Sequence, residues 1–142
     1  MIIPDANLLL YAYDSSSPFH PAAKAWCEQI MTGPEPVALL PVVIFGFVCI
    51  STHPRIYARP LHASEASAHV ARWLARPHVS VIDMQADDVA RALDLLEKAG
   101  TAGNLTSDAQ IAAVALRLNA HVHTADLDFG RFAGVRFTSP LK

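Results

Sequence analysis

The sequence predicts an α/β fold, in which helices flank a central parallel sheet of four to five strands in an α/β/α sandwich. Short apolar segments alternate with helical patterns along the chain, and this order is typical of parallel sheets with right-handed crossovers. Hydrophobic residues make up 52% of the sequence and charged residues 17%, which favours strands buried on both faces. The length of 142 residues suits one domain over residues 1–142.

The first half of the chain contains two predicted strands, each followed by helices. In order, we expect a strand ending at Asp5, helices from Asn7 to Tyr13 and from His20 to Thr32, a strand over 37–40 and a helix starting at Pro41. Prolines at positions 21 and 41 suit a first helical turn, where a missing N–H costs little. The helix after Pro41 is apolar on every side. We therefore expect a partner to cover it, most simply a second copy in a homodimer.

The second half continues the alternation after a loop over 53–60. We expect a helix over 64–76, a strand over 79–82, a helix capped by Asp87 or Asp88 and ended by Gly100, a helix capped by Thr106 or Ser107, a strand over 121–124, a turn or short helix over 125–132 and a last strand over 135–137. On the helix before Gly100, the spacing of Val89, Leu93 and Leu96 predicts that these three face the core.

Composition also bears on location and partners. No stretch has the length of a membrane span or the pattern of a signal peptide, so we expect a cytoplasmic protein with no membrane contact. Cys27 and Cys49 have no metal-ligand spacing and are expected to be reduced structural thiols. The net charge of −2 offers no overall attraction to nucleic acid, so RNA binding would need a local basic patch.

Four acids occupy positions where parallel strands end or helices begin. Asp5 follows the first strand, Asp108 lies in the first turn of the helix that starts near Thr106, and Asp126 and Asp128 follow the fourth strand. If those strands are neighbours, the four carboxylates converge on the crevice where α/β proteins bind ligands. Two carboxylates 4 Å apart repel by roughly 4 kcal/mol at a dielectric near 20, so the cluster needs protons or cations. Mg²⁺ or Mn²⁺ fits oxygen ligands and supplies a water that can act as nucleophile.

Each acid also has an ordinary structural explanation. Asp108 would serve as a helix cap, Asp126 and Asp128 as turn formers, and Asp5 with Asn7 as another cap. A different chemistry, in which Asp5 is an aspartyl nucleophile of a phosphotransferase, is disfavoured because an asparagine stands two residues later. These alternatives remain open at the level of the residues alone.

Three segments, in order, carry a resemblance that spans nearly the whole chain. They are Ile3-Pro4-Asp5-Ala6-Asn7-Leu8-Leu9, the segment from Leu105 to Ala113, and Thr124-Ala125-Asp126-Leu127-Asp128-Phe129 with a closing Gly134-Val135. Together they resemble PIN-domain ribonucleases, and more closely the VapC toxins of bacterial toxin–antitoxin pairs. The resemblance implies an Mg²⁺- or Mn²⁺-dependent endoribonuclease that cleaves structured cellular RNA, such as tRNA or rRNA, and is inhibited by a VapB-like antitoxin.

The resemblance also assigns roles residue by residue. Asp5, Asp108 and Asp126 match metal-binding acids of the family, and Asp128 matches an additional acid. In supporting positions, Thr124 matches a hydroxyl residue and Asn7 a polar residue beside the first acid.

One position departs from the family pattern. Many members carry a glutamate within the third helix, where this chain has Gly46. The alternative function is therefore a catalytically weakened PIN-like module that binds RNA or an antitoxin.

Basic residues outside the acids are candidates for RNA contacts. His53, Arg55 and Arg59 lie in one loop together with Tyr57, and Arg131 follows the last acids. They suit phosphate contacts and base stacking, although the loop has equal standing as an ordinary solvated segment.

Two strand histidines are candidates for a zinc site instead. We expect His121 and His123 to face opposite sides of the sheet, and so to be structural rather than ligands of one ion.

Overall fold

The structure, a computed structural model that describes residues 1–141, contains a sheet of five parallel strands in the order β3-β2-β1-β4-β5. The strands are β1 (Ile2–Pro4), β2 (Val37–Leu39), β3 (Val79–Val81), β4 (His121–His123) and β5 (Arg136–Thr138). The predicted α/β class and parallel sheet are confirmed.

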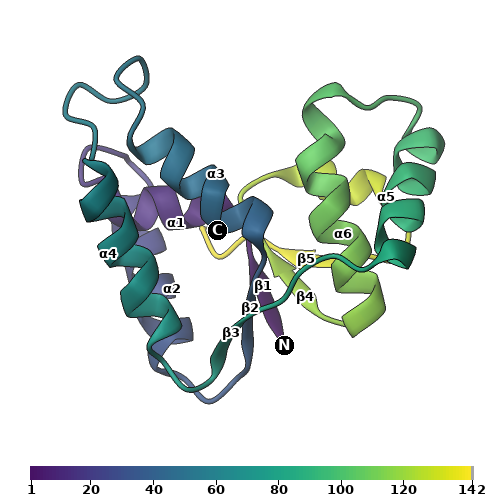
Figure 1. Cartoon of the computed structure of the whole chain (residues 1–142), viewed down its shortest axis with the longest axis horizontal. Helices are drawn as coiled ribbons and strands as arrows, with labels where there is room; N and C mark the ends of the chain where they lie inside the picture. Colours follow the sequence, from purple (N-terminus) through teal and green to yellow (C-terminus); the bar gives the residue numbers. More distant parts are fainter. Residues whose placement is uncertain (142) are drawn as a thin grey trace.

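Helices cover both faces of this sheet (Figure 1). On one side lie α1 (Ala6–Tyr13), α2 (His20–Thr32), α3 (Pro41–Ser51) and α4 (Ala63–Leu74). On the other side lie α5 (Ala86–Ala99) and α6 (Thr106–Leu118). Two short 3₁₀ helices, η1 (Gly103–Leu105) and η2 (Leu127–Arg131), precede α6 and follow β4. Within residues 1–141, no helix combines the length and apolar character needed to cross a bilayer.

The strand register places the ends of β1 and β4 side by side. Ile3 is paired with Val122 in the sheet, and the backbone N–H of Asp5 donates to the carbonyl of His123 at 2.8 Å. The chain segments that follow these two strands therefore leave the sheet at the same edge, as the convergence of the acids requires.

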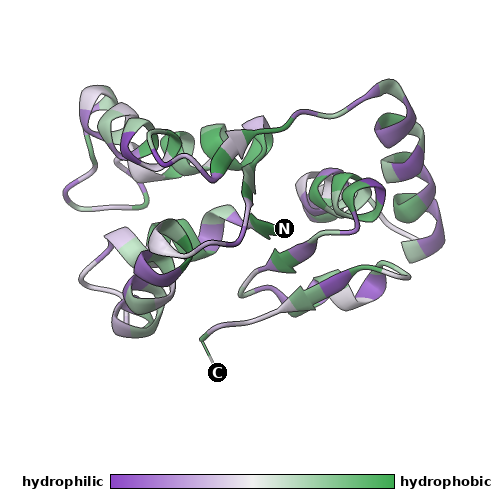
Figure 2. Cartoon of the chain, turned by 90° about the horizontal axis from the view of Figure 1, so that it is seen from below, coloured by the Kyte–Doolittle hydropathy of each residue, from purple (hydrophilic) through white to green (hydrophobic). Residues whose placement is uncertain are grey.

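The central strands are buried on both faces, as their continuous apolar sequences predict. Ile3, Val37, Leu39 and Val122 are all 0% exposed. Hydrophobic residues dominate the strands beside the N-terminus, whereas the outermost helix, α5, carries hydrophilic residues along its length (Figure 2). The acids thus stand on a sheet that packing holds rigidly.

The predicted C-terminal end of α5 is confirmed, whereas the predicted N-caps of α5 and α6 are wrong. Gly100 ends α5 with a left-handed φ of +80°, as predicted. The cap of α5 is different: Gln85 precedes the helix, and its backbone N–H donates to the Asp88 carboxylate at 2.9 Å. Thr106 and Ser107 are not caps, because both lie within α6.

The predicted inner face of α5 is confirmed for Leu96 but wrong for Val89 and Leu93. Val89 and Leu93 are 50% and 58% exposed, whereas Ala92, Leu95 and Leu96 are buried. Asp88 is 0% exposed and bonds Arg117 of α6, with a 2.9 Å separation between Asp88 Oδ2 and Arg117 Nε. This ion pair joins the buried side of α5 to α6.

Helix α3 is only partly covered. Val43 and Phe47 are buried, but Phe45 is 68% exposed. Val81, on the edge strand β3, is 50% exposed. Cys27 and Cys49 form no disulfide within residues 1–141. The apolar surface around Phe45 is the one for which a second copy was expected.

Candidate active site

Asp5 is held in one orientation by two hydrogen bonds. It is the N-cap of α1, and its Oδ1 accepts from the Ala6 N–H at 2.7 Å. Its Oδ2 accepts from the Thr124 hydroxyl at 2.8 Å. The residue is only 8% exposed. Asp5 is therefore a preorganised carboxylate at the carboxyl end of β1 and also caps a helix.

Thr124 and Asn7 join the end of β4 to α1. The Thr124 hydroxyl accepts from the Asp126 N–H at 2.9 Å and from the Asn7 side-chain amide at 3.4 Å. In return, Asn7 Oδ1 accepts from the Ala125 N–H at 3.3 Å. The structure thus brings both predicted supporting residues into one network with Asp5 and Asp126.

The other three acids stand at the ends of short or regular helices. Asp126 is the N-cap of η2, and its Oδ1 accepts from the Asp128 N–H at 2.8 Å. Asp128 is exposed at the rim. Asp108 lies in the first turn of α6 and is half-buried.

The four acids are close enough to perturb one another. The pKa of Asp108 is raised to about 7, first by burial and then by the negative charges of Asp5 and Asp126, with a smaller contribution from Asp128. A helix N-terminus favours the ionised form of Asp108, but burial and the like charges outweigh it. Burial also raises the pKa of Asp5, although its bonds from Thr124 and Ala6 oppose the shift. The predicted convergence therefore occurs.

The donor set fits a hard divalent cation. The ion pairs within residues 1–141 involve Asp88 and Asp94, so no basic side chain there neutralises the four acids. Carboxylate oxygens are the ligands that Mg²⁺ and Mn²⁺ prefer. The side chains in the described part of the chain do not form a ready-made group of three ligands. Asp5 and Asp126 each accept a hydrogen bond from a backbone N–H group, and like charges repel one another.

Gly46 lies beside this cluster. A Cβ built on Gly46 would be 3.6 Å from the Cβ of Ala6, the residue that follows Asp5. That separation is an ordinary van der Waals contact. The position where the resemblance places a glutamate is thus next to the acids, with room for a side chain.

The raised pKa of Asp108 predicts a pH-dependent stability. The folded state keeps the proton up to a pKa of about 7, whereas the unfolded chain releases it near 3.8. Between these values the folded state binds more protons, so this group lowers the unfolding free energy as pH rises. Asp108→Asn removes the effect. The quantity to compare is the melting temperature of the variant minus that of the original protein, measured in chelator. We expect this difference to be more positive at about pH 8 than at about pH 5.

With Mg²⁺ at about pH 8, the original protein should melt at a higher temperature than the variant. The ion binds the folded original protein and stabilises it, and it stabilises the variant less. Thermal melts with and without Mg²⁺ measure both effects. A relative stability that is the same at both pH values would contradict a shifted Asp108.

The candidate RNA-binding residues lie on two loops. His53 Nδ1 accepts from the Arg55 N–H at 3.1 Å, and Arg55 and Arg59 are exposed in the loop between α3 and α4. Arg131 lies at the end of η2 and donates to the Ala99 carbonyl at 3.1 Å. These cations lie on different elements and do not form one patch, and the loop with His53, Arg55 and Arg59 follows the far end of α3 from the strand ends.

The two strand histidines correct one expectation. His121 and His123 are two residues apart on β4 and therefore share a face, with ring centroids 5.3 Å apart. Their partners are structural: Trp26 Nε1 donates to His123 Nδ1 at 2.9 Å, and His121 Nε2 lies 2.5 Å from the Thr138 hydroxyl. The two histidines are therefore still interpreted as structural and not as zinc ligands. The reason is their hydrogen bonds to Trp26 and Thr138, and not opposite orientations.

Comparison with known proteins gives whole-chain matches. The PIN domain profile matches residues 2–135. Ribonuclease VapC33 of Mycobacterium tuberculosis is 42% identical over 142 residues, covering 100% of this chain and 99% of the relative. Ribonuclease VapC37 of the same organism is 37% identical, covering 99% and 97%.

Solved structures show the same fold at lower identity. Mycobacterium tuberculosis VapC20, described as a sarcin-ricin loop cleaving toxin, superimposes with a TM-score of 0.71 at 19% identity, covering 96% of this chain and 99% of that one. VapBC2 of Rickettsia felis, bound to a DNA fragment of its promoter, gives 0.69 at 20% identity, with 98% of both chains covered.

Proposed function

The chain belongs to the PIN-domain family, with VapC ribonucleases as relatives over its whole length, and we propose that its clustered acids hold the divalent cation with which it cleaves RNA. It is an endoribonuclease of the VapC toxin type. The proposed ion is Mg²⁺ or Mn²⁺, the proposed ligands are Asp5, Asp108 and Asp126, and the proposed substrate is structured RNA such as tRNA or rRNA. The observation that carries this proposal is the Asp5 carboxylate, fixed by Thr124 and the Ala6 N–H beside Asp108 and Asp126, with no basic side chain of residues 1–141 paired to these acids.

Each acid has a distinct part in the proposed site. Thr124 and the Ala6 N–H fix the Asp5 carboxylate, so little rearrangement is needed when the ion binds. Asp108 would hold the ion in its ionised form, together with Asp126 at the start of η2, and Asp128 would be the exposed acid beside them. When bound, a divalent cation lowers the pKa of its water and neutralises phosphate charge.

RNA would be held by cations at the edges of the site. We assign His53, Arg55, Arg59 and Arg131 to phosphate contacts, because the net charge of −2 requires local attraction. We place the protein in the cytoplasm, as one PIN-like domain over residues 1–142.

A VapB-like antitoxin is the proposed inhibitor. Solved structures with the same fold include toxin–antitoxin complexes such as that from Klebsiella pneumoniae. The uncompensated acids of this chain favour a partner that brings a basic side chain to them, together with an apolar segment. Co-expression with a small neighbouring reading frame should give a complex that no longer cleaves RNA.

The proposal is tested by incubating the purified protein with total RNA. Mg²⁺ or Mn²⁺ should support cleavage, and chelation should stop it. Cleavage that continues in excess chelator would contradict the metal assignment while leaving the family assignment in place.

Gly46 favours the second candidate, a weakened module that binds RNA or an antitoxin without efficient cleavage. We expect Gly46→Glu to fit, because a Cβ there meets Ala6 at an ordinary 3.6 Å. The added carboxylate should tighten Mn²⁺ binding by about tenfold or more, the scale of a supporting group in metal sites.

Gly46→Gln, of the same shape without the charge, is the matched control. Calorimetric titration with Mn²⁺ measures both variants. Equal affinities for the two would show that position 46 does not face the ion.

The apolar surface on α3, α4 and β3 supports a homodimer as part of the proposal. Ile44, Phe45, Val70, Leu74 and Val81 line a hollow of about 450 Å³ there. We expect light scattering to give a dimer mass for the original protein and a monomer mass for Phe45→Glu. Leu93→Glu, at a position 58% exposed on α5, should remain dimeric. A monomeric original protein would exclude this interface.

A further inference from the structure

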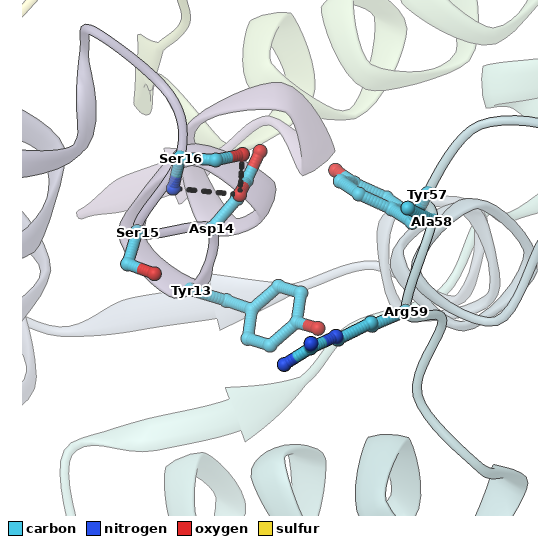
Figure 3. A pocket seen from close by; sticks show the side chains of 7 residues that line it. All are labelled: Tyr13, Asp14, Ser15, Ser16, Tyr57, Ala58 and Arg59. Atoms are coloured by element: carbon cyan, nitrogen blue, oxygen red, sulfur yellow. Dashed lines mark hydrogen bonds between the residues drawn. The ribbon is translucent and has the colours of Figure 1, made fainter.

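A second hollow lies at the far end of α1 from the acids. It has a volume of about 300 Å³, within the lower range of small-ligand sites. Its walls come from the end of α1 and the loop after it, with Tyr13, Asp14 and Ser16, and from the loop after α3, with Tyr57 and Arg59. These five residues, which we call the tyrosine pocket, surround an open space (Figure 3).

The two tyrosines form a fixed aromatic wall. Their ring centroids are 6.2 Å apart at 74°. The Tyr13 ring also meets Phe47 at 6.5 Å and His69 at 5.6 Å, so the core holds it in place. Both tyrosines are half-buried, which leaves part of each ring open. Exposed aromatic rings of this kind stack nucleobases.

Two opposite charges, those of Asp14 and Arg59, face this space without forming ion pairs among residues 1–141. Asp14 Oδ1 accepts from the Ser16 N–H at 3.0 Å and from the Ser16 hydroxyl at 2.6 Å, which fixes the carboxylate. The ion pairs of residues 1–141 involve neither Asp14 nor Arg59. In Figure 3 the carboxylate and the Tyr57 hydroxyl point toward one another, and Arg59 extends beside the Tyr13 ring.

A ligand for this pocket must offer hydrogen-bond donors to Asp14 and negative charge to Arg59. Among the RNA bases, guanine presents two adjacent donors, N1–H and the N2 amino group, on one edge. Asp14 Oδ2, which takes no bond from Ser16, can accept from both of these donors, whereas Oδ1 already accepts two bonds from Ser16. Adenine and cytosine each offer one amino group on that edge, and uracil one N–H. The phosphate of the same nucleotide suits the guanidinium of Arg59.

The distance from the tyrosine pocket to the acids suits two nucleotides of one strand that lie a few positions apart. Asp5 caps the start of α1 and Tyr13 ends it. With 1.5 Å per residue, the eight residues of α1 separate them by about 12 Å. That is the rise of about three to four stacked nucleotides at about 3.4 Å each.

We propose that the tyrosine pocket binds a guanine of the RNA substrate, a few nucleotides from the bond that the acids cleave. Asp14 binds the base edge and Arg59 binds the phosphate. The base stacks on the ring of one tyrosine, and the other tyrosine, at 74° to the first, contacts the edge of the base. The inference rests on the proposed function, because it adds a base-reading subsite to the same RNA path.

Mononucleotides test the pocket separately from catalysis, because they contain no bond to cleave. We expect guanosine 5′-monophosphate to bind at least about tenfold tighter than the adenosine, cytidine and uridine monophosphates, the scale of one bidentate base contact. Asp14→Asn should remove this preference while keeping the Ser16 bonds that fix the loop. Arg59→Gln should weaken all four nucleotides alike. Asp83→Asn, an exposed acid on another loop, is the control.

Ligand-observed NMR titration measures these affinities, and sequencing of cleavage ends gives an independent reading. The original protein should cut at a fixed offset from guanine, and Asp14→Asn should cut without that bias. Equal affinities for the four nucleotides, or a guanine preference that survives Asp14→Asn, would overturn the subsite while leaving the nuclease proposal intact. Guanine binding without RNA cleavage would support the subsite and contradict the nuclease proposal.

Discussion

Asp5→Asn should lower RNA cleavage by more than about 100-fold without unfolding the protein. Loss of a group that only supports a metal ligand costs 10–100-fold, so loss of a ligand charge should cost more. The substitution is nearly isosteric. An asparagine oxygen can still accept from Ala6 or from Thr124, which bond Asp5 at 2.7 and 2.8 Å. Rates of RNA cleavage in saturating Mg²⁺, beside melting curves, measure the two effects.

Asp83→Asn provides a closely matched control. Asp83 follows β3 much as Asp5 follows β1, and its carboxylate also accepts from the next residue's N–H, at 2.7 Å. It is exposed and has no part in the acid cluster. We expect this variant to cleave normally. If both variants lost activity equally, the loss would reflect strand-end structure and not an ion.

Asp88→Ala should have the largest effect on stability. Asp88 is 0% exposed and accepts from Arg91 Nη1 at 2.8 Å, from Arg117 Nε at 2.9 Å and from the Gln85 N–H at 2.9 Å. Its loss leaves two partly buried arginines without their shared partner. Breaking a fully buried pair costs about 3–5 kcal/mol, but water partly solvates these arginines, which are 35% and 21% exposed. We therefore expect a smaller cost, which should lower the melting temperature by roughly 5 °C or more.

Asp94→Ala is the control for this prediction. Asp94 pairs with Lys98 at 2.9 Å, but the two side chains are 53% and 72% exposed, and exposed pairs contribute little. Denaturant unfolding measures the free energy of unfolding of both variants. An Asp88 variant as stable as the Asp94 variant would mean that the contact between α5 and α6 does not depend on this ion pair.

The sequence was sufficient to predict the sheet and the acids. Asp5 and Asp126 follow apolar strands, and because parallel strands all point the same way, their ends meet at one edge. The only additional assumption was that β1 and β4 are neighbours, which the pairing of Ile3 with Val122 confirms. The roles of these acids in metal binding stay a prediction.

Features that depend on contacts distant in sequence were not predictable. The buried side of α5 includes Asp88, which pairs with Arg117 far along the chain. Apolar spacing alone therefore predicted Leu96 correctly but Val89 and Leu93 wrongly. The tyrosine pocket likewise joins two loops, and only Tyr57 and Arg59 stood out in the sequence. Asp14 looked like an ordinary turn residue because its pattern with Ser16 is local.

The position of a Mn²⁺ ion in a crystal of the protein, found from its anomalous scattering, tests the central claim most directly. We predict one strong peak at bonding distance from carboxylate oxygens of Asp5 and of Asp108 or Asp126. Manganese bound elsewhere, or absent from these acids in crystals of protein that cleaves RNA, would contradict the account.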